Sequence, residues 1–315
     1  MTDHANIRVA ICISTFRRQK LLRELLRGIV QLSFRKVVAP QIEVVVVDTP
    51  DESGSAREIC ETVSLPWPIK YVVEPRRGLT YARNRAVAEA ASTDFIAFID
   101  DDEVPAQQWL DELLWTQAEF GAYIVSGPVS PMYAPQVPDW IKAGDFFASK
   151  PKPTGAPCRT CATHNALVSA RVFERVPGFD HAFALSGAED TDFFLRAAHA
   201  GCKIVWSQEA VVYEHTSASR GTIRWILSRE YQTGNGWVFA EAVVDSRRRT
   251  WIVRFSKACG HVVMGSANAF WRLLTLDRAA VLRSLQRVSL GTGMLAALVG
   301  HKFLAYQNVA IDQGS

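Results

Sequence analysis

The feature that most constrains this fold is a short apolar run that leads directly into four consecutive carboxylates. Residues 95–99 read Phe-Ile-Ala-Phe-Ile, and residues 100–103 read Asp-Asp-Asp-Glu. Five apolar residues are too few for a helix and are typical of a strand buried on both faces, as in a parallel sheet covered by helices. Ligands of such sheets bind at the carboxyl ends of the strands. The sequence therefore predicts a ligand site at the end of this strand.

The four carboxylates also indicate a cation site. Acids this close together repel one another and would destabilise the fold unless a cation lies beside them. A hard divalent ion, Mg²⁺ or Mn²⁺, takes oxygen ligands and commonly bridges one or two carboxylates to substrate phosphates. The alternative is a polar exit from the strand in which Asp102 or Glu103 caps the next helix.

Other apolar runs predict the rest of the sheet. Strands are expected at residues 8–13, 42–47 and 71–73, with helical patterns between them. This strand–helix alternation predicts an α/β fold with a doubly wound, mostly parallel sheet. Further along we expect a strand at 123–129, a long loop or lid at 131–157, a helix from 187 to about 201, and edge strands at 203–206 and 210–213.

Composition places the chain among ordinary globular proteins, with 48% apolar and 21% charged residues in 315. Its six cysteines are scattered, which does not resemble a disulfide framework and fits a reducing cytosol. Residues 1–4 lack the pattern of a secretion signal, and no uncharged apolar run reaches the roughly 20 residues that span a bilayer. We therefore expect a cytoplasmic protein.

The pattern becomes helical from about residue 222, which predicts a division into residues 1–220 and a helical C-terminal extension, residues 221–315. The extension carries many cations, among them Arg247, Arg248, Arg249, Arg254, Lys257, Arg278, Arg283 and Arg287. Its apolar residues include aromatic ones such as Trp251, Phe255, Phe270 and Trp271. Basic amphipathic helices of this kind lie in the membrane interface, where their cations meet anionic lipids. The alternative is a helical pair that packs back on the domain.

Asp48 ends a predicted strand at the same sheet edge as residues 100–102. A carboxylate there could accept hydrogen bonds from a base or ribose, or it could cap a turn near Ser53, and both interpretations stay open. A glycine-rich dinucleotide fingerprint is absent after the first strand, which counts against a nicotinamide or flavin enzyme. Phosphates would then need a metal and basic side chains. The candidates are Arg76, Arg77, Arg83 and Arg85, of which we favour Arg83.

A second acidic cluster, Glu189, Asp190 and Asp192, follows the small residues 186–188. Acids in the first turn stabilise a helix through its dipole, so part of this cluster is capping chemistry. A carboxylate near a metal-bound phosphate could also accept the proton of an attacking hydroxyl. Glu189 and Asp190 should point to different sides of the helix and have different roles, while Asp192 should face solvent or hold the helix.

A histidine and a pair of cysteines are further candidates for metal binding. His215 ends a predicted strand and could be a metal ligand as a neutral imidazole, although a structural role is equally open. Cys158 and Cys161, with His164 nearby, superficially resemble a zinc or redox site. No second cysteine pair stands at ligand spacing, so we interpret them as loop cysteines.

Taken in order, these motifs resemble those of family 2 glycosyltransferases with the GT-A fold. The matching residues are 9–17, 44–48, 78–84, 98–103 and 189–192, within a resemblance that covers roughly residues 8–230. Segments 127–129, 138–140, 144–146, 163–167 and 187–194 further resemble bacterial exopolysaccharide glucosyltransferases of the succinoglycan-assembly type. Ala188 stands where those enzymes usually have glycine, and His164 where cysteine is usual. These departures bear on donor or acceptor preference.

The resemblance implies an inverting transfer of a hexose, glucose, from a UDP-sugar in the presence of Mg²⁺ or Mn²⁺. The acceptor would be a hydroxyl of a polyprenyl-diphosphate-linked oligosaccharide in exopolysaccharide synthesis. Residues 1–220 would be the catalytic domain, peripherally associated with the cytoplasmic face of the inner membrane through residues 221–315. No nucleic acid partner is expected.

The resemblance, joined to the residue patterns above, assigns roles to individual residues. Asp190 would be the catalytic base and Glu189 would bind the acceptor. Asp102 would ligate the metal, and the residue pattern adds His215 as a second ligand. The nucleotide-sugar would be bound by Thr15, Arg17, Asp48, Arg83, Asp100 and Asp101, with Asp100 on the ribose or in the metal shell. Asp101, like Glu103, is also expected to have a structural role.

Two rival functions fit parts of the pattern. A nucleotidyltransferase acting on sugar phosphates also joins an α/β sheet to metal-binding acids, but it would usually show a glycine- and lysine-rich phosphate loop after the first strand. A catalytically inactive scaffold of the same fold could bind sugars or membranes. The presence of Asp100, Asp102 and Asp190 argues against that scaffold.

Overall fold

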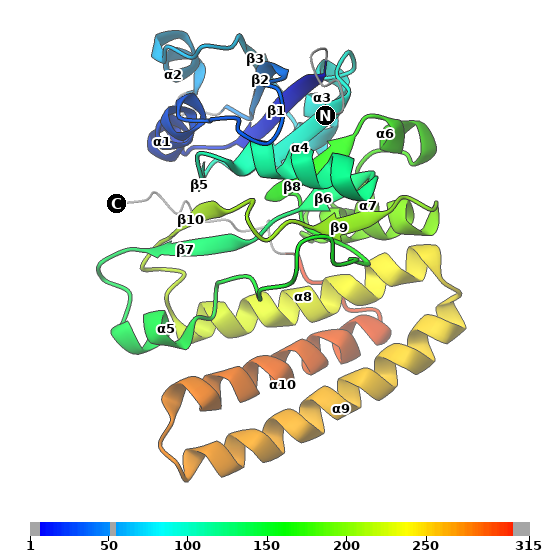
Figure 1. Ribbon diagram of the computed structural model, residues 1–315. Coiled ribbons are helices and arrows are strands. Elements are labelled where there is room, and N and C mark those ends of the chain that lie inside the picture. Colours follow the sequence, from blue (N-terminus) through cyan, green and yellow to red (C-terminus); the bar gives the residue numbers. More distant parts are fainter. Residues whose placement is uncertain (1–6, 51–54, 305–315) are drawn as a thin grey trace.

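The computed structural model describes residues 7–50 and 55–304, and Figure 1 shows an α/β body resting on a layer of three long helices. The main sheet has seven strands in the order β3-β2-β1-β4-β8-β6-β9, and β8 runs antiparallel to both of its neighbours. The predicted α/β fold with a mostly parallel sheet is confirmed. The strands are β1 (Arg8–Thr15), β2 (Gln41–Asp48), β3 (Ile69–Val73), β4 (Phe95–Ile99), β6 (Ile124–Ser126), β8 (Asn165–Ser169) and β9 (Ile204–Trp206).

Alternation along the strands builds one apolar core on each face of the sheet. On one face, Ile11 and Val44 pack with the buried side of α1, and on the other Ala10 and Val45 pack with residues of α3 and α7. Both faces are covered by helices, which explains why β1, β2 and β4 are apolar in consecutive positions. The helices of this body are α1 (Gln19–Val30), α2 (Arg57–Thr62), α3 (Leu79–Glu89), α4 (Trp109–Phe120), α6 (Arg171–Arg175) and α7 (Glu189–His199).

A second, three-stranded sheet has the order β5-β10-β7, and Figure 1 shows β7 and β10 beside the lower part of the main sheet. Its strands are β5 (Glu103–Pro105), β7 (Val129–Tyr133) and β10 (Val212–Thr216). The prediction of an edge strand at residues 210–213 is wrong, because β10 pairs on both sides. The expected single strand at 123–129 is divided between β6 and β7, and the expected loop at 131–157 contains helix α5 (Asp139–Gly144).

The division occurs beside Gly127, which is packed too closely for a side chain. A Cβ atom there would lie 2.1 Å from the carbonyl oxygen of Ala210. Glycine therefore lets the chain pass from the main sheet to the small sheet against the segment before β10.

The C-terminal layer consists of α8 (Ile223–Val244), α9 (Arg247–Leu273) and α10 (Arg278–Leu298). Helix α10 lies between α8 and α9, and α8 also packs against α7 (Figure 1). Glycines allow the close approach of α8 and α10, since a Cβ on Gly234 would lie 2.1 Å from the carbonyl oxygen of Leu290. Leu282 and Met294 are buried, so for α10 the structure favours the alternative of packing on the protein. The division at residues 220 and 221 stays a prediction.

None of the helices within residues 7–50 and 55–304 combines the length and the apolar character needed to cross a bilayer.

Candidate active site

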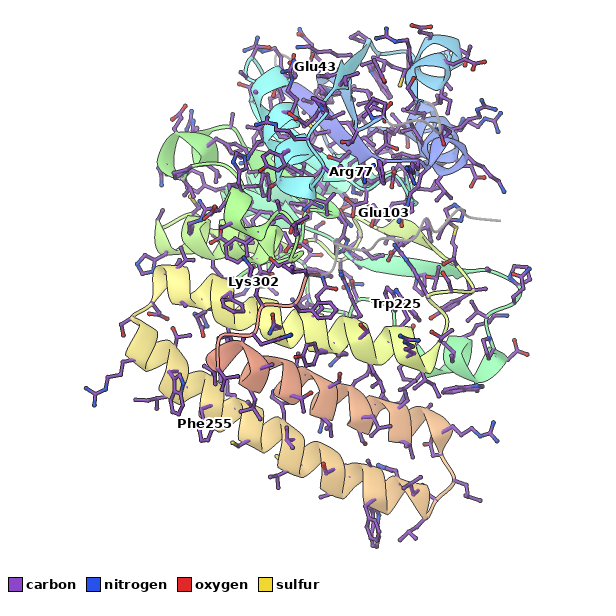
Figure 2. All side chains as sticks on the ribbon, turned by 180° about the vertical axis from the view of Figure 1, so that it is seen from behind. Glu43, Arg77, Glu103, Trp225, Phe255 and Lys302 are labelled. Carbon is purple, nitrogen blue, oxygen red and sulfur yellow. The ribbon has the colours of Figure 1, made fainter. Side chains whose placement is uncertain are left out.

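The acidic residues after β4 form a tight turn into β5. The backbone N–H of Asp100 donates to Glu103 Oε2 at 2.9 Å, and the backbone N–H of Glu103 donates to the carbonyl of Asp100 at 3.1 Å. Figure 2 shows Glu103 between the main sheet and the helical layer. The turn therefore places its remaining carboxylates at the carboxyl edge of the sheet, as the sequence predicts.

Asp101 ties this turn to the end of β1. Thr15 Oγ1 donates to Asp101 Oδ2 at 2.8 Å, and Arg18 Nη1 donates to Asp101 Oδ1 at 2.9 Å. Burial raises the pKa of Asp101 to about 6, against the opposing effect of Arg18. Two residues expected to bind the donor, Thr15 and Asp101, thus lie together and bind each other.

Asp102 lies between two arginines. Its Oδ2 is 2.9 Å from Arg18 Nη1 and 3.0 Å from Arg220 Nη2. Arg220 also pairs with Glu214, at 2.6 Å. Sequence reasoning missed both arginines. The signals were present in the arginine pair that follows the first strand and in an arginine five residues after His215.

A cavity of about 480 Å³ opens beside this ion pair, and Arg18, Asp102, His215 and Arg220 are among its lining residues. The backbone N–H of His215 donates to the carbonyl of Asp102 at 2.8 Å. The structure therefore brings together the two residues that the sequence predicts as metal ligands. They share their cavity with cations suited to a phosphate.

Asp102 and His215 fit a metal-binding role only in combination with ligand oxygens. Among the described residues, no group of three or more His, Cys, Asp or Glu side chains is placed to hold a metal. His215 Nε2 is buried and makes no hydrogen bond within the described part of the chain, although Glu24 Oε2 lies 3.0 Å away. Since Mg²⁺ is usually held by one or two carboxylates and substrate phosphates, these two side chains fit a site that a diphosphate completes.

The first turn of α7 is connected to the acidic turn through Arg83 on α3. Arg83 is buried, pairs with Glu189 Oε1, and lies 3.4 Å from Asp100 Oδ1. Burial raises the pKa of Glu189 to about 7, although Arg83 opposes the shift. Glu189 Oε2 is buried and has no hydrogen-bond partner among the described residues. Arg83 therefore bridges the two acidic clusters.

Asp190 and Asp192 have different surroundings from Glu189. Asp190 is half-buried, and its Oδ1 accepts from the backbone N–H of Thr191 at 2.6 Å and from the Thr191 hydroxyl at 3.2 Å. Asp192 is fully buried and pairs with Arg196 at 2.7 Å. The option that Asp192 faces solvent is wrong, because it holds the helix through an i,i+4 pair.

The predicted nucleotide side of the site lies at the ends of β1 and β2, where Thr15 pairs in register with Asp48. Asp48 Oδ2 accepts from the backbone N–H of Ala56 at 2.7 Å and from the Tyr71 hydroxyl at 2.8 Å. This carboxylate therefore holds the segment that enters α2. The Ser53 of the capping alternative lies outside the described residues.

Arg17 and the other candidate arginines are placed differently. Arg17 has a left-handed backbone, with φ 58°, and its guanidinium lies 5.0 Å from the Phe16 ring centroid. A non-glycine residue in this region indicates local strain, which is common at ligand sites. Arg76 pairs with Glu74 and Arg85 with Glu89, while Arg77 lies over the ring of Phe16. Of the four candidates that the sequence suggested for phosphates, Arg83 is the one whose ion pairs reach the acidic clusters among the described residues.

Comparison with known proteins identifies the family. Residues 10–176 match Glycosyl transferase family 2, and residues 95–304 match Glycosyl transferase family group 2. The chain is 32% identical over 304 residues to the succinoglycan biosynthesis protein ExoM of Rhizobium meliloti (strain 1021), with 94% of each chain covered. This chain belongs to glycosyl transferase family 2.

Solved structures agree on the fold of this family 2 chain. A mannosyltransferase from Pyrobaculum calidifontis in complex with GDP-Man and Mn²⁺ matches with a TM-score of 0.61 at 20% identity, over 92% of this chain and 87% of that one. GalNAc-T7 with UDP, GalNAc and Mn²⁺ matches with a TM-score of 0.54 at 13% identity, over 77% and 52% of the two chains. The expected GT-A fold is confirmed.

His164, which precedes β8, lies at the acidic turn. His164 Nδ1 is 3.4 Å from Glu103 Oε1. Burial alone would lower the pKa of His164, but the hydrogen bond and charge of Glu103 raise it to about 9. The imidazole of His164 is therefore protonated beside the carboxyl of Glu103, which closes the turn. Cys158 and Cys161 are both free and lie in loop, as the sequence predicts.

Proposed function

We propose that this family 2 glycosyltransferase moves a hexose, glucose, from a UDP-sugar to a hydroxyl of a polyprenyl-diphosphate-linked oligosaccharide, with inversion, in exopolysaccharide synthesis. The observation that carries the proposal is the Asp100–Arg83–Glu189 connection, which joins the predicted donor site to the helix of the predicted base. Similarity to a succinoglycan biosynthesis protein supports the exopolysaccharide product. Solved structures of the same fold with GDP-Man or UDP support a nucleotide-sugar donor.

The donor would lie along the carboxyl edge of the main sheet. Its base and ribose would approach Asp48, Thr15 and Arg17 at the ends of β1 and β2, and Asp100 beyond them. Its diphosphate would enter the cavity beside Asp102, where Arg18 and Arg220 can turn from the carboxylate to the phosphate oxygens. Asp102 and His215 would hold Mg²⁺ or Mn²⁺. The bound cation would neutralise charge on the departing diphosphate.

Asp190 would act as the general base. Its carboxylate accepts the proton of the acceptor hydroxyl while that oxygen forms a bond to the anomeric carbon. The bond between the anomeric carbon and the diphosphate oxygen breaks on the opposite side, and UDP leaves with the bonding electrons. A single in-line displacement of this kind inverts the anomeric centre and needs no glycosyl-enzyme intermediate. Glu189, held by Arg83, would position the acceptor from the adjacent helix position.

With a lipid-linked acceptor, the reaction would take place at the cytoplasmic face of the inner membrane. A peripheral association fits the cations and exposed aromatic residues of the C-terminal helices. The catalytic cavity and the C-terminal layer belong to different parts of the fold, so transfer chemistry and membrane contact can be measured separately.

The test is an assay of the full-length protein with a panel of UDP- and GDP-sugars and either Mg²⁺ or Mn²⁺. We expect donor hydrolysis, and transfer to a polyprenyl-diphosphate-linked oligosaccharide, to be fastest with UDP-glucose. Release of UDP with an inverted product supports the proposal. Formation of a nucleotide-sugar from a sugar phosphate, with release of pyrophosphate, would instead establish the nucleotidyltransferase alternative. Donor binding without turnover under every condition would establish the inactive scaffold.

A further inference from the structure

The turn between α9 and α10 exposes an unusual concentration of apolar side chains. Within seven residues, five large apolar side chains are between 58% and 87% exposed: Phe270, Trp271, Leu273, Leu274 and Leu276. Figure 1 places this turn at the end of the helical layer far from β1, β2 and β3. A group of this size on a protein surface marks an interaction site.

Leu276 is the extreme member of this group. It is 87% exposed and has a left-handed backbone, with φ 55°. A bulky apolar residue is unfavourable in this conformation, and its exposure to water removes any gain from packing. The Leu276 side chain therefore gains no packing energy within the protein, which indicates that it packs against another surface.

A cavity of about 340 Å³ lies beside the same turn, between α9 and α10. Its lining includes three arginines, Arg272, Arg283 and Arg287, together with the polar residues Asn268 and Ser284. Asp277 also lines it, but this carboxylate already caps α10, because Asp277 Oδ1 accepts from the backbone N–H of Ala280 at 2.9 Å. The cavity therefore has an excess of positive charge and hydrogen-bond donors, which suits a phosphate group.

The charge of the surrounding segment decides between possible occupants. Residues 246–276 contain no Asp or Glu, and Asp277 is the only acid between residues 246 and 304. Two copies of the chain that met through this turn would bring their arginines together with no acid from this segment except Asp277, which already caps α10. An anionic bilayer offers phosphates to the arginines and acyl chains to the five apolar side chains. Trp271 also suits the boundary between water and lipid.

We propose that the α9–α10 turn is a membrane-docking site, in which the cavity lined by Arg272, Arg283 and Arg287 binds the phosphate of an anionic phospholipid and the five apolar side chains enter the interface. This inference rests on the proposed function, because it supplies the contact that brings the enzyme to a lipid-linked acceptor. It restricts that contact to one end of the C-terminal layer, whereas the buried apolar residues of α10, such as Leu282 and Met294, take no part.

The test is co-sedimentation of the full-length protein with phosphatidylcholine vesicles, with and without phosphatidylglycerol. We expect binding to the phosphatidylglycerol vesicles and little to pure phosphatidylcholine. Arg287→Gln should weaken vesicle binding about fivefold, because one cation near an anionic surface contributes roughly 1 kcal/mol to binding. Leu276→Ser should weaken it about 10- to 100-fold, since one buried leucine contributes roughly 1.5–3 kcal/mol.

Matched controls lie elsewhere on the surface. Arg171→Gln on α6 and Ile223→Ser at the start of α8 change an exposed arginine and an exposed apolar residue, and both should leave vesicle binding unchanged. Circular dichroism checks that each variant is folded. Equal vesicle binding by the wild type, Arg287→Gln and Leu276→Ser would overturn the proposal.

Two other outcomes would also overturn it. The first is stabilisation by inorganic phosphate that Arg287→Gln removes, without vesicle binding, which would indicate a free anion site. The second is a dimer that Leu276→Ser dissociates in analytical ultracentrifugation, which would indicate a second copy. Hydrolysis of UDP-glucose in solution should be the same in all variants. If the wild type did not hydrolyse UDP-glucose, that result would count against the proposed function alone, because vesicle binding does not depend on hydrolysis.

Discussion

The two acidic clusters of this family 2 chain look alike in sequence but are stabilised in different ways. In the turn after β4, arginines from distant segments neutralise the acids, as Arg18 does for Asp101 and Asp102. In the first turn of α7 the partners are more varied. Asp192 uses Arg196 of its own helix, while Asp190 accepts hydrogen bonds from its neighbour Thr191.

This difference distinguishes acids that stabilise the fold from acids that are available for catalysis or ligand binding. Asp101 has both carboxylate oxygens hydrogen-bonded inside the protein, and Glu103 and Asp192 each have one. Asp190 is half-buried and needs no cation for its position. Within residues 7–50 and 55–304, the side chain of Asp102 pairs with Arg18 and Arg220, and both arginines can also bind phosphate. Arg83 links the clusters, so a change there should affect both.

The largest effect is expected for Asp190→Asn, which removes the proposed base. Transfer should fall about 10²- to 10⁴-fold, since an amide cannot accept the hydroxyl proton. UDP affinity, measured by calorimetry, should stay within a factor of two, because the change lies outside the donor site. Asp192→Asn is the matched control, and it should lower stability while the folded fraction keeps its turnover. A rate for Asp190→Asn within tenfold of the wild type would remove this residue from the proton transfer.

The next effect is expected for Arg83→Met, which breaks the link between the clusters. It leaves the buried Glu189 without its cation, and the loss of one partner of a buried pair typically costs about 3–5 kcal/mol. Urea denaturation measures the change in the free energy of unfolding. Arg85→Met, on the same helix, removes an exposed pair with Glu89 and should cost less than about 1 kcal/mol. Equal losses in the two variants would mean that Arg83 does not join the clusters energetically.

The smallest effect is a pH dependence that sharpens the same comparison. The pKa of Glu189 is raised from 4.5 to about 7 by burial, so the folded protein keeps this proton at a pH where the unfolded chain has lost it. The free energy of unfolding should therefore fall as the pH rises from about 4.5 to about 7 and then level off. The total is at most about 3 kcal/mol at 1.36 kcal/mol per pKa unit.

Glu189→Gln has no such proton to lose. Its urea denaturation between pH 5 and pH 8 should lack the Glu189 contribution, so the difference in stability between wild type and variant should change with pH. Parallel pH profiles for the two proteins would contradict the raised pKa.

Much of the α/β body could be predicted from local pattern. Short apolar runs predicted β1, β2 and β4, because a strand buried on both faces must be apolar at consecutive positions. The antiparallel insertion of β8 and the central place of β10 were missed. Both depend on which strands pair across long distances, and an apolar run carries no information about its partner.

For the candidate site, too, some residues were predictable from the sequence and others were not. The sequence placed acids at the ends of predicted elements, and the structure brings Asp102 and His215 to one cavity. Arg18 and Arg220 were missed, because an arginine in a loop becomes part of a site only when folding places it beside a carboxylate. Asp101 and Asp102 are adjacent and chemically identical, and only their contacts assign them different surroundings.

By itself, the sequence determined that this chain would form an α/β body with acids at the carboxyl edge of its sheet and basic helices at its C-terminus. Apolar periodicity and charge are local properties, and they are readable before the chain folds. Only the tertiary structure decided that α10 is enclosed while the α9–α10 turn is exposed, and that Arg83 joins the two acidic clusters. Burial and charge pairing depend on neighbours that are distant in sequence, so they exist only once the chain is packed.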